Sequence, residues 1–337
     1  MVVNLLQNGK IGLAPMEGVI DALTRELLTR QAGFDWTVTE FVRVVDTRLP
    51  PRVFYRHCPE LAKRPVATPS GVPVHIQLLG SDPEALAENA RQALALGALS
   101  VDLNFGCPAK LVNRHDGGAS LLRRPERVYQ AVKAVAEALG GEIPVTAKIR
   151  LGFSDRRLAV ACAQATESGG AARLVVHGRT RDEGYRPPAH WEWIGRVRQQ
   201  VSIPVVANGD IWSLEAYWKA RTLSGCRDVM LGRSALADPW LAPRIRHWQQ
   251  TGERLPETTW EMRASVLREY ADLQRQHLPD RIVVSLVKQW LAQMRQGNAE
   301  ANQHFHRVKR LTDLETLLSS LVADMPLALA EPESLGL

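Results

Sequence analysis

The chain has 337 residues, of which 45% are hydrophobic and 6% aromatic, enough apolar material for a sizeable core. No apolar run reaches the roughly 18 to 20 residues of a membrane span. Residues 1–10 lack the pattern of an export signal, so we expect a cytoplasmic protein. The net charge of +6 is a modest indication of a polyanionic partner.

The four cysteines are far apart and form no CxxC pair. This spacing argues against a disulfide framework and against a zinc site, and we expect no bound metal. The cysteines are Cys58, Cys107, Cys162 and Cys226.

Eight short runs of β-type residues follow one another along the first two thirds of the chain, and helix-type segments separate them. They cover residues 11–16, 36–41, 74–80, 100–106, 144–150, 173–179, 203–210 and 228–233. Residues 82–97 and 124–141 show helix start and stop signals, with Pro125 inside the start of the second helix and Gly140 past its end.

Strands that alternate with helices indicate parallel pairing through right-handed crossovers. Eight such units predict an α/β fold, a closed (β/α)8 TIM barrel, because the count matches and no Gly-x-Gly-x-x-Gly motif opens the first unit. A doubly wound open sheet is the alternative.

The pattern changes after about residue 245, where the β-type runs stop. Residues 258–278, 281–297 and 298–325 predict about three helices, and residues 327–337 a frayed tail. One apolar stripe follows helical spacing through Val284, Val287, Leu291 and Met294. We therefore expect a barrel domain over residues 1–245 and a helical domain over residues 246–337.

Polar residues stand at the carboxyl ends of several β-type runs, where a barrel assembles its active site. They are Glu17, Glu40, Gln77, Asn104, Cys107, Lys148, Arg150, His177, Arg179, Asn208 and Arg233. The loops after runs seven and eight commonly bind phosphate in such barrels. Gly209 and Gly232 there, with the charge of Arg233, indicate a phosphate-bearing cofactor.

Cys107 lies between Gly106 and Pro108, directly after the fourth run. A buried, inert thiol is the commoner role of a free cysteine. A thiol with an ordinary pKa is mostly protonated at neutral pH and can act as a general acid. The nucleophile alternative requires a base, and His115 is the nearest histidine in sequence. We favour the acid role.

Seven motifs together resemble the tRNA-dihydrouridine synthases in order and spacing, over nearly the whole chain. They are LAPMEGV (13–19), QLLG (77–80), NFGCP (104–108), KIRLG (148–152), HGRT (177–180), NGDI (208–211) and GR (232–233). The segments TEFVRVVD (39–46) and VKQWL (287–291) look most like the C type, which reduces uridine 16 in the D-loop of tRNA.

The resemblance implies FMN at the barrel mouth and NADPH as the reductant. The implied flavin-ring contacts are Pro15, Met16, Glu17, Gln77, Lys148 and His177. The implied phosphate contacts are Asn208, Gly209, Asp210, Gly232 and Arg233. In the implied reaction, FMN passes a hydride to C6 of the uracil and Cys107 protonates C5.

The resemblance also implies tRNA as the partner, and the helical domain fits this. Residues 281–310 contain six Lys or Arg residues and one acid, and a spacing of seven places three of the basic residues on one helix face. A solvated face is the alternative interpretation. The residues expected to orient tRNA are Arg43, Asn104, Arg150, Lys288 and Arg295.

Two rival functions are a flavin-dependent reductase of a free pyrimidine and a non-catalytic RNA-binding barrel. The first gives no reason for a basic helical domain, and the second gives none for Cys107 and Lys148. We expect a monomer that binds neither DNA nor a membrane.

Overall fold

The structure is a computed structural model that describes residues 9–322, with residues 115 and 297 left out. The predictions for residues 1–8, His115 and residues 327–337 therefore lie outside the described residues. The chain divides into two compact units, Met1–Leu255 and Pro256–Leu337. The expected division at residue 245 falls inside helix α10 (Leu241–Thr251), which packs on α8 (Leu214–Ser224) and α9 (Arg233–Ala237) of the first unit.

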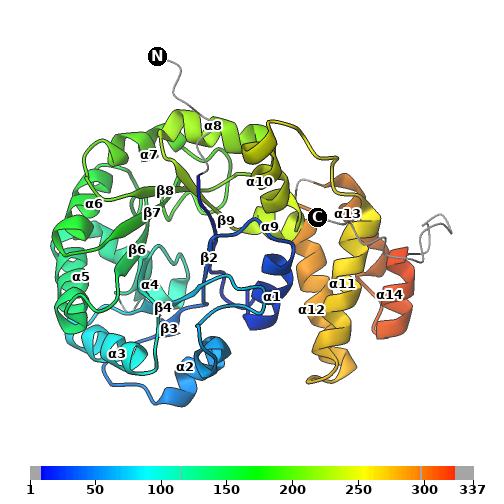
Figure 1. The fold of residues 1–337 in the computed structure, drawn as a ribbon, viewed down its shortest axis with the longest axis horizontal. Helices are drawn as coiled ribbons and strands as arrows, with labels where there is room; N and C mark the ends of the chain where they lie inside the picture. The colour runs from blue at the N-terminus through cyan, green and yellow to red at the C-terminus, as the bar shows by residue number, and fades with distance from the viewer. Residues whose placement is uncertain (1–8, 115, 297, 323–337) are drawn as a thin grey trace. The chain divides into compact units, whose positions relative to one another are not determined.

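Eight parallel strands close the barrel of the first unit, as the sequence predicts (Figure 1). They are β1 (Ile11–Leu13), β2 (Trp36–Val38), β4 (Val74–Leu79), β5 (Val101–Phe105), β6 (Val145–Arg150), β7 (Arg173–His177), β8 (Val205–Asn208) and β9 (Asp228–Leu231). Strand β2 pairs with both β1 and β4, which completes the ring and excludes the open-sheet alternative. The short β3 (Val42–Arg43) adds a second parallel pairing to β4.

Helices surround the ring of strands in Figure 1. The α-helices of this unit, α10 aside, are α1 (Ala22–Arg30), α2 (Pro51–His57), α3 (Pro83–Ala95), α4 (Lys110–Arg114), α5 (Pro125–Leu139), α6 (Ala159–Ser168), α7 (Trp191–Arg198), α8 (Leu214–Ser224) and α9 (Arg233–Ala237). Two 3-10 turns cover Pro59–Ala62 and Gly118–Arg123. The helix start and stop signals in the sequence are confirmed for α3 and α5. The Asp82 side chain caps the start of α3, and Gly140 ends α5 in the left-handed conformation.

Alternate residues of the strands fill the barrel interior. One cluster contains Ala14, Trp36, Val38, Val175, Val206 and Met230. It joins β2 to β7, which are not neighbours in the ring, so these side chains meet across the interior. On the other strands, Gln77 of β4 is in register with Asp102 of β5, and Asn104 of β5 is in register with Lys148 of β6. The interior is thus apolar on one side and polar on the other.

The second unit contains four helices among the described residues. They are α11 (Trp260–Gln274), α12 (Asp280–Met294), α13 (Ala299–Val308) and α14 (Leu314–Val322). The last segment that was expected to be helical contains two helices, α13 and α14. The Asp313 side chain accepts the Thr316 backbone N–H at 2.8 Å and so caps the start of α14. All four residues of the predicted apolar stripe are buried, as expected. None of the helices in the described ranges is long and apolar enough to span a membrane.

Candidate active site

The polar residues predicted at strand ends come together at the carboxyl end of the barrel. Asn104 on β5 pairs in register with Lys148 on β6, and His177 on β7 pairs with Asn208 on β8. Because these strands are consecutive in the ring, their side chains line one continuous part of the mouth.

Gly232 follows β9, which lies between β8 and β1 in the ring. A Cβ atom added to it would meet Ala14 Cβ at 3.6 Å and Met16 Sδ at 3.9 Å, both at the end of β1. These distances are ordinary van der Waals contacts, so no clash requires glycine here. The missing side chain instead leaves room beside Met16. Pro15 and Met16 are half-buried, whereas Glu17 is exposed.

A chain of hydrogen bonds connects the polar interior to the mouth. Asp102, buried on β5, accepts from Thr146 Oγ1 at 2.5 Å and from Gln77 Nε2 at 2.7 Å. Gln77 Oε1 accepts from Asn104 Nδ2 at 2.8 Å, and Asn104 Oδ1 accepts from the Gly106 N–H at 2.9 Å. The fully buried Gln77 thereby holds Asn104, which is partly exposed.

Cys107 is 8% exposed and packs with Phe41, Leu79 and Val112. Burial raises the pKa of its thiol and the Glu17 carboxylate raises it further, while the Arg150 charge opposes both. The thiol is therefore protonated at neutral pH, as a general acid must be.

The other three cysteines are deeper in the fold. Burial raises the pKa of Cys58 and of Cys162 to about 12, and that of Cys226 to about 11. No charged residue of the mouth contributes to these shifts, which agrees with packing roles.

Lys148 and His177 share an environment of low solvent exposure and positive charge. Burial, helped by the Arg150 charge, lowers the pKa of Lys148 to about 8, although the Asp102 carboxylate opposes the shift. Burial also lowers the pKa of His177 well below its usual range, and Arg150 contributes again. His177 is therefore neutral at neutral pH. Among the described residues, the Lys148 ammonium has no hydrogen bond or ion pair.

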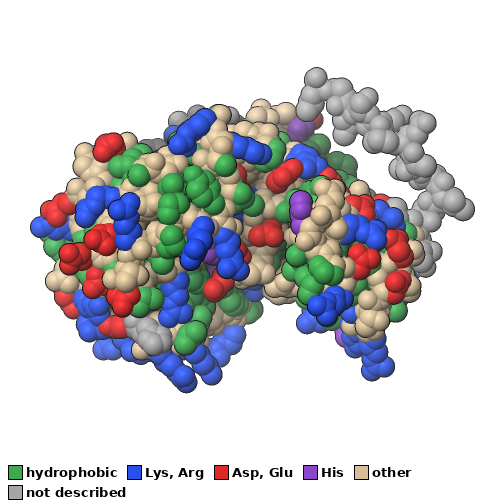
Figure 2. All heavy atoms as spheres, turned by 90° about the horizontal axis from the view of Figure 1, so that it is seen from below, with side chains coloured by type: hydrophobic (Ala, Val, Ile, Leu, Met, Phe, Trp, Pro, Cys, Tyr) green, Lys and Arg blue, Asp and Glu red, His purple; other side chains and the backbone are tan. Residues whose placement is uncertain are grey.

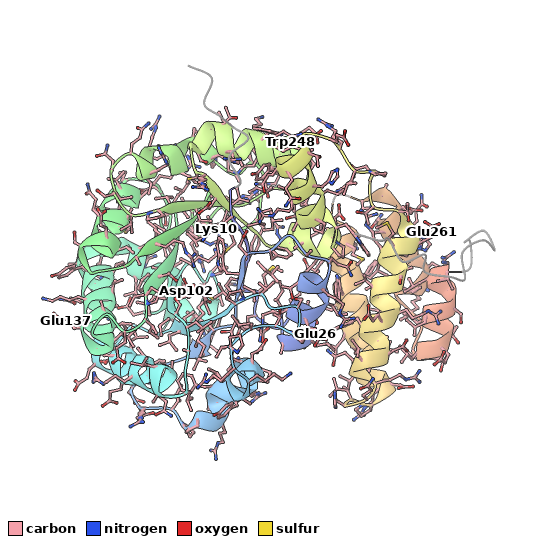
Figure 3. The ribbon with its side chains drawn as sticks, in the orientation of Figure 1. Lys10, Glu26, Asp102, Glu137, Trp248 and Glu261 are labelled. Carbon is pink, nitrogen blue, oxygen red and sulfur yellow. The ribbon has the colours of Figure 1, made fainter. Side chains whose placement is uncertain are left out.

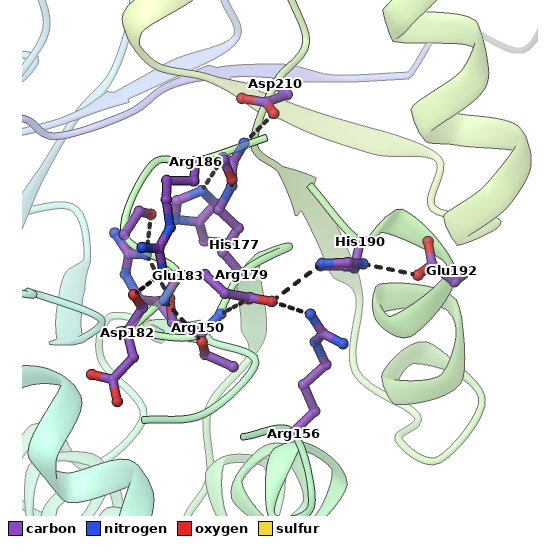
Figure 4. A network of polar contacts seen from close by, with 12 residues as sticks. Arg150, Arg156, His177, Arg179, Asp182, Glu183, Arg186, His190, Glu192 and Asp210 are labelled. Carbon is purple, nitrogen blue, oxygen red and sulfur yellow. Dashed lines mark hydrogen bonds and ion pairs between the residues drawn. The ribbon is translucent and has the colours of Figure 1, made fainter. Parts of the chain in front are cut away.

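Asp210 does not present a free carboxylate, because two arginines bind it, and Figure 4 shows the first of them, Arg179. It forms an ion pair with the buried Arg179, and a second one with Arg233 at 3.5 Å. The neighbouring Gly209 has φ +113°, and a Cβ atom there would lie 2.7 Å from His177 Cδ2. Only glycine fits between this turn and the imidazole ring.

The residues expected to contact tRNA have different surroundings. Arg43 is half-buried on β3, near enough to Cys107 to lower its pKa. Arg150 is 2% exposed and donates to backbone carbonyls. In the second unit Lys288 Nζ donates to the Leu311 carbonyl, and the exposed Arg295 lies 4.4 Å from the Phe305 ring centroid. On the face drawn in Figure 2, this unit shows Lys and Arg interspersed with Asp and Glu.

Comparisons with known proteins agree with this arrangement. The family model described as dihydrouridine synthase (Dus) matches residues 12–325. The chain belongs to the dihydrouridine synthase family. A protein of Ralstonia nicotianae named tRNA-dihydrouridine(16) synthase is 47% identical, over 91% of this chain and 93% of that protein. Proteins with the same name from Cupriavidus necator and Escherichia coli O157:H7 are 46% and 43% identical, over 96% and 93% of this chain and 99% and 98% of theirs.

A likeness to one solved structure concerns the fold alone. Histamine dehydrogenase from Rhizobium sp. 4-9 superposes with a TM-score of 0.52 at 14% identity, over 71% of this chain and 46% of that one.

This dihydrouridine synthase family member also has site residues that the sequence analysis missed. Asp102 lies two residues before Asn104, and strand alternation places both side chains on the same face. That spacing could have indicated Asp102. The partners of Asp210 could not be found in this way, because Arg179 and Arg233 are distant from it in sequence.

Proposed function

We propose that this protein reduces the C5=C6 bond of uridine 16 in the D-loop of tRNA to give dihydrouridine. The observation that carries the proposal is the position of Cys107. Its protonated thiol lies at the carboxyl end of the barrel, in the loop that directly follows Asn104. The extensive identity to proteins named tRNA-dihydrouridine(16) synthase supports uridine in tRNA as the substrate.

FMN fits the residues at the mouth. The Lys148 ammonium lacks a partner among the described residues. The neutral His177 offers the N–H of one ring nitrogen, because its Nε2 atom accepts from Arg179 Nη1 at 3.4 Å. The room beside Gly232 adjoins Ala14 and Met16. We assign Pro15, Met16, Glu17, Gln77, Lys148 and His177 to the flavin ring. When bound, FMN supplies the hydride for C6 after NADPH has reduced it.

The phosphate of FMN requires donors, and the loops after β8 and β9 provide them. We assign it to Asn208, Gly209, Gly232 and Arg233. Asp210 has a different role in this proposal, because its carboxylate binds two arginines and would repel a phosphate. It orients the Arg233 guanidinium toward the group that Arg233 binds.

Cys107 supplies the proton in the proposed reaction. Burial raises the pKa of its thiol, which keeps the proton available for C5 of the uracil. The thiolate left behind lies near two positive charges, Arg150 and Arg43, which both lower the pKa of Cys107. Asn104 holds the base, since its amide orientation is fixed by Gln77 and Gly106.

The two units have different roles in the proposed reaction. The barrel unit binds FMN and carries the chemistry, and the helical unit binds tRNA through Lys288, Arg295 and neighbouring basic residues. Arg43 contributes from the barrel. A uridine in a loop costs less to extrude from its stack than a paired one, which suits reduction of the D-loop. We place the protein in the cytoplasm, as a monomer that binds neither DNA nor a membrane.

The experiment compares two unmodified tRNA transcripts, one with uridine and one with cytidine at position 16, each with purified protein, FMN and NADPH. Mass spectrometry is expected to find dihydrouridine at position 16 of the first transcript only. Free uridine is the matched control and is expected to remain unreduced. Dihydrouridine at another position would refute the U16 assignment, and reduction of free uridine alone would favour the pyrimidine reductase.

A further inference from the structure

Arg150 connects two loops at the barrel mouth. Its Nε atom donates to the Gly106 carbonyl at 2.9 Å. Its Nη1 atom donates to the carbonyls of Thr180 at 3.1 Å and Gly184 at 2.9 Å. Gly106 directly precedes Cys107, whereas Thr180 and Gly184 belong to the segment after β7. One buried side chain therefore bonds the Cys107 loop to the segment of residues 178–186.

The backbone around Cys107 is bonded at several points. The Gly106 N–H donates to Asn104 Oδ1 at 2.9 Å, and Arg150 binds the carbonyl of the same residue. The Cys107 carbonyl accepts from Asn113 Nδ2 at 3.0 Å and from the Ala119 N–H at 3.2 Å. These contacts restrict the backbone on both sides of the thiol.

The segment that Arg150 binds is itself fixed (Figure 4). The Thr180 N–H donates to Glu183 Oε2 at 2.7 Å, and the other oxygen of Glu183 forms an ion pair with Arg156. Arg179 Nε donates to the Arg186 carbonyl at 2.6 Å. Residues 178–186 thus provide a rigid support against which Arg150 can hold the Cys107 loop.

We propose that Arg150 is a positioning residue for Cys107, which it holds through the Gly106 carbonyl. This assignment leaves the expected tRNA contact of Arg150 as a separate prediction, and it depends on the proposed function only for the role of Cys107 as the acid. A lysine keeps the charge but donates from a single point, so it cannot reach carbonyls on both loops as the planar guanidinium does.

The test measures alkylation of Cys107 by iodoacetamide in the protein without FMN or tRNA, with peptide mass spectrometry to separate the four cysteines. The variants are Arg150→Lys, Arg150→Met and Arg43→Met. The last is the matched control, because Arg43 also lowers the pKa of Cys107 but donates no hydrogen bond to its loop among the described residues. Rates are recorded over a range of pH, which separates thiol acidity from access.

Both Arg150 variants are expected to raise the limiting rate at high pH by about tenfold, because each loses the hydrogen bonds that keep the loop closed. The pH midpoint should rise in Arg43→Met, which loses a charge and keeps the loop closed. It should fall in Arg150→Lys, because the opened loop relieves the burial that raises the pKa of the thiol, and lie between these two in Arg150→Met, where the lost charge opposes that fall. A limiting rate in Arg150→Lys equal to that of the wild type overturns the proposal.

Asn113→Ala provides a second route if the Arg150 variants do not fold. It removes a different contact to the Cys107 carbonyl, and the limiting rate should rise as well; an unchanged rate would count against the proposal. In the reaction with tRNA, Arg150→Lys is expected to lower kcat with little change in KM. A raised KM with unchanged kcat would assign Arg150 to tRNA instead. Absence of dihydrouridine with the wild type refutes the proposed function but leaves the alkylation result intact.

Discussion

Replacing Lys148 with methionine is expected to stabilise the protein without FMN. The ordinary pKa of a lysine is 10.5, and burial lowers that of Lys148 to about 8. One pKa unit corresponds to about 1.4 kcal/mol, so the charged ammonium costs at most about 3 kcal/mol of folding free energy at neutral pH. Methionine has a similar length and carries no charge. Lys148→Met should therefore be up to about 3 kcal/mol more stable at pH 7.

The difference in stability between Lys148→Met and the wild type should depend on pH. Between about pH 8 and pH 10.5 the unfolded chain holds a proton that folded Lys148 has released, so wild-type stability rises with pH there. The advantage of Lys148→Met should shrink over this interval and vanish above it. Urea unfolding of the two proteins at several pH values measures it. A variant that is less stable by the same amount at every pH would refute the reasoning. Added FMN should stabilise the wild type more than the variant, since the ammonium then has a partner.

Three other substitutions test separate parts of the site. Gly209→Ala should lower the free energy of unfolding by about 2 to 4 kcal/mol, because its Cβ atom would clash with His177 and its φ is +113°; an unchanged melting curve would contradict this. Cys107→Ser should reduce turnover by about a hundredfold or more while flavin absorbance and tRNA affinity remain, and equal losses in affinity would argue against the acid role. Arg295→Ala should weaken tRNA binding and lower the slope of log affinity against log salt by about 1; an unchanged slope would exclude a phosphate contact.

The sequence predicted the barrel well, because its signals are local. Each strand is a short β-type run, and each helix signal, such as Asp82 before α3 or Gly140 after α5, acts within a few residues. The strand-end rule then brought the polar residues to one face, since parallel strands in a closed ring all end on the same side. Asn104, Lys148 and His177 followed from this rule alone.

Side-chain pairing within the mouth could not be predicted in the same way. Arg150 stands at a strand end and is basic, so the sequence indicated an anionic partner, yet its guanidinium binds three carbonyls. Asp210 similarly stands in a phosphate-type loop but pairs with Arg179 and Arg233. Each partner depends on which rotamers the assembled barrel permits, and sequence distance contains no information about that.

Asp102 lies near the centre of the ring of strands, as Figure 3 shows. It is the acid whose charge opposes the lowered pKa of Lys148, but Thr146 and Gln77 occupy its oxygens. Arg179 and Arg233, by contrast, form ion pairs with the Asp210 carboxylate. The protein thus pairs Arg179 and Arg233 with a carboxylate and leaves the Lys148 ammonium without a bonded anion among the described residues. Such an arrangement costs stability in the empty protein, and an electron-rich ring bound above Lys148 would offset that cost. The stability gained in Lys148→Met and the binding of a flavin above Lys148 therefore both depend on the unpaired charge of this ammonium group.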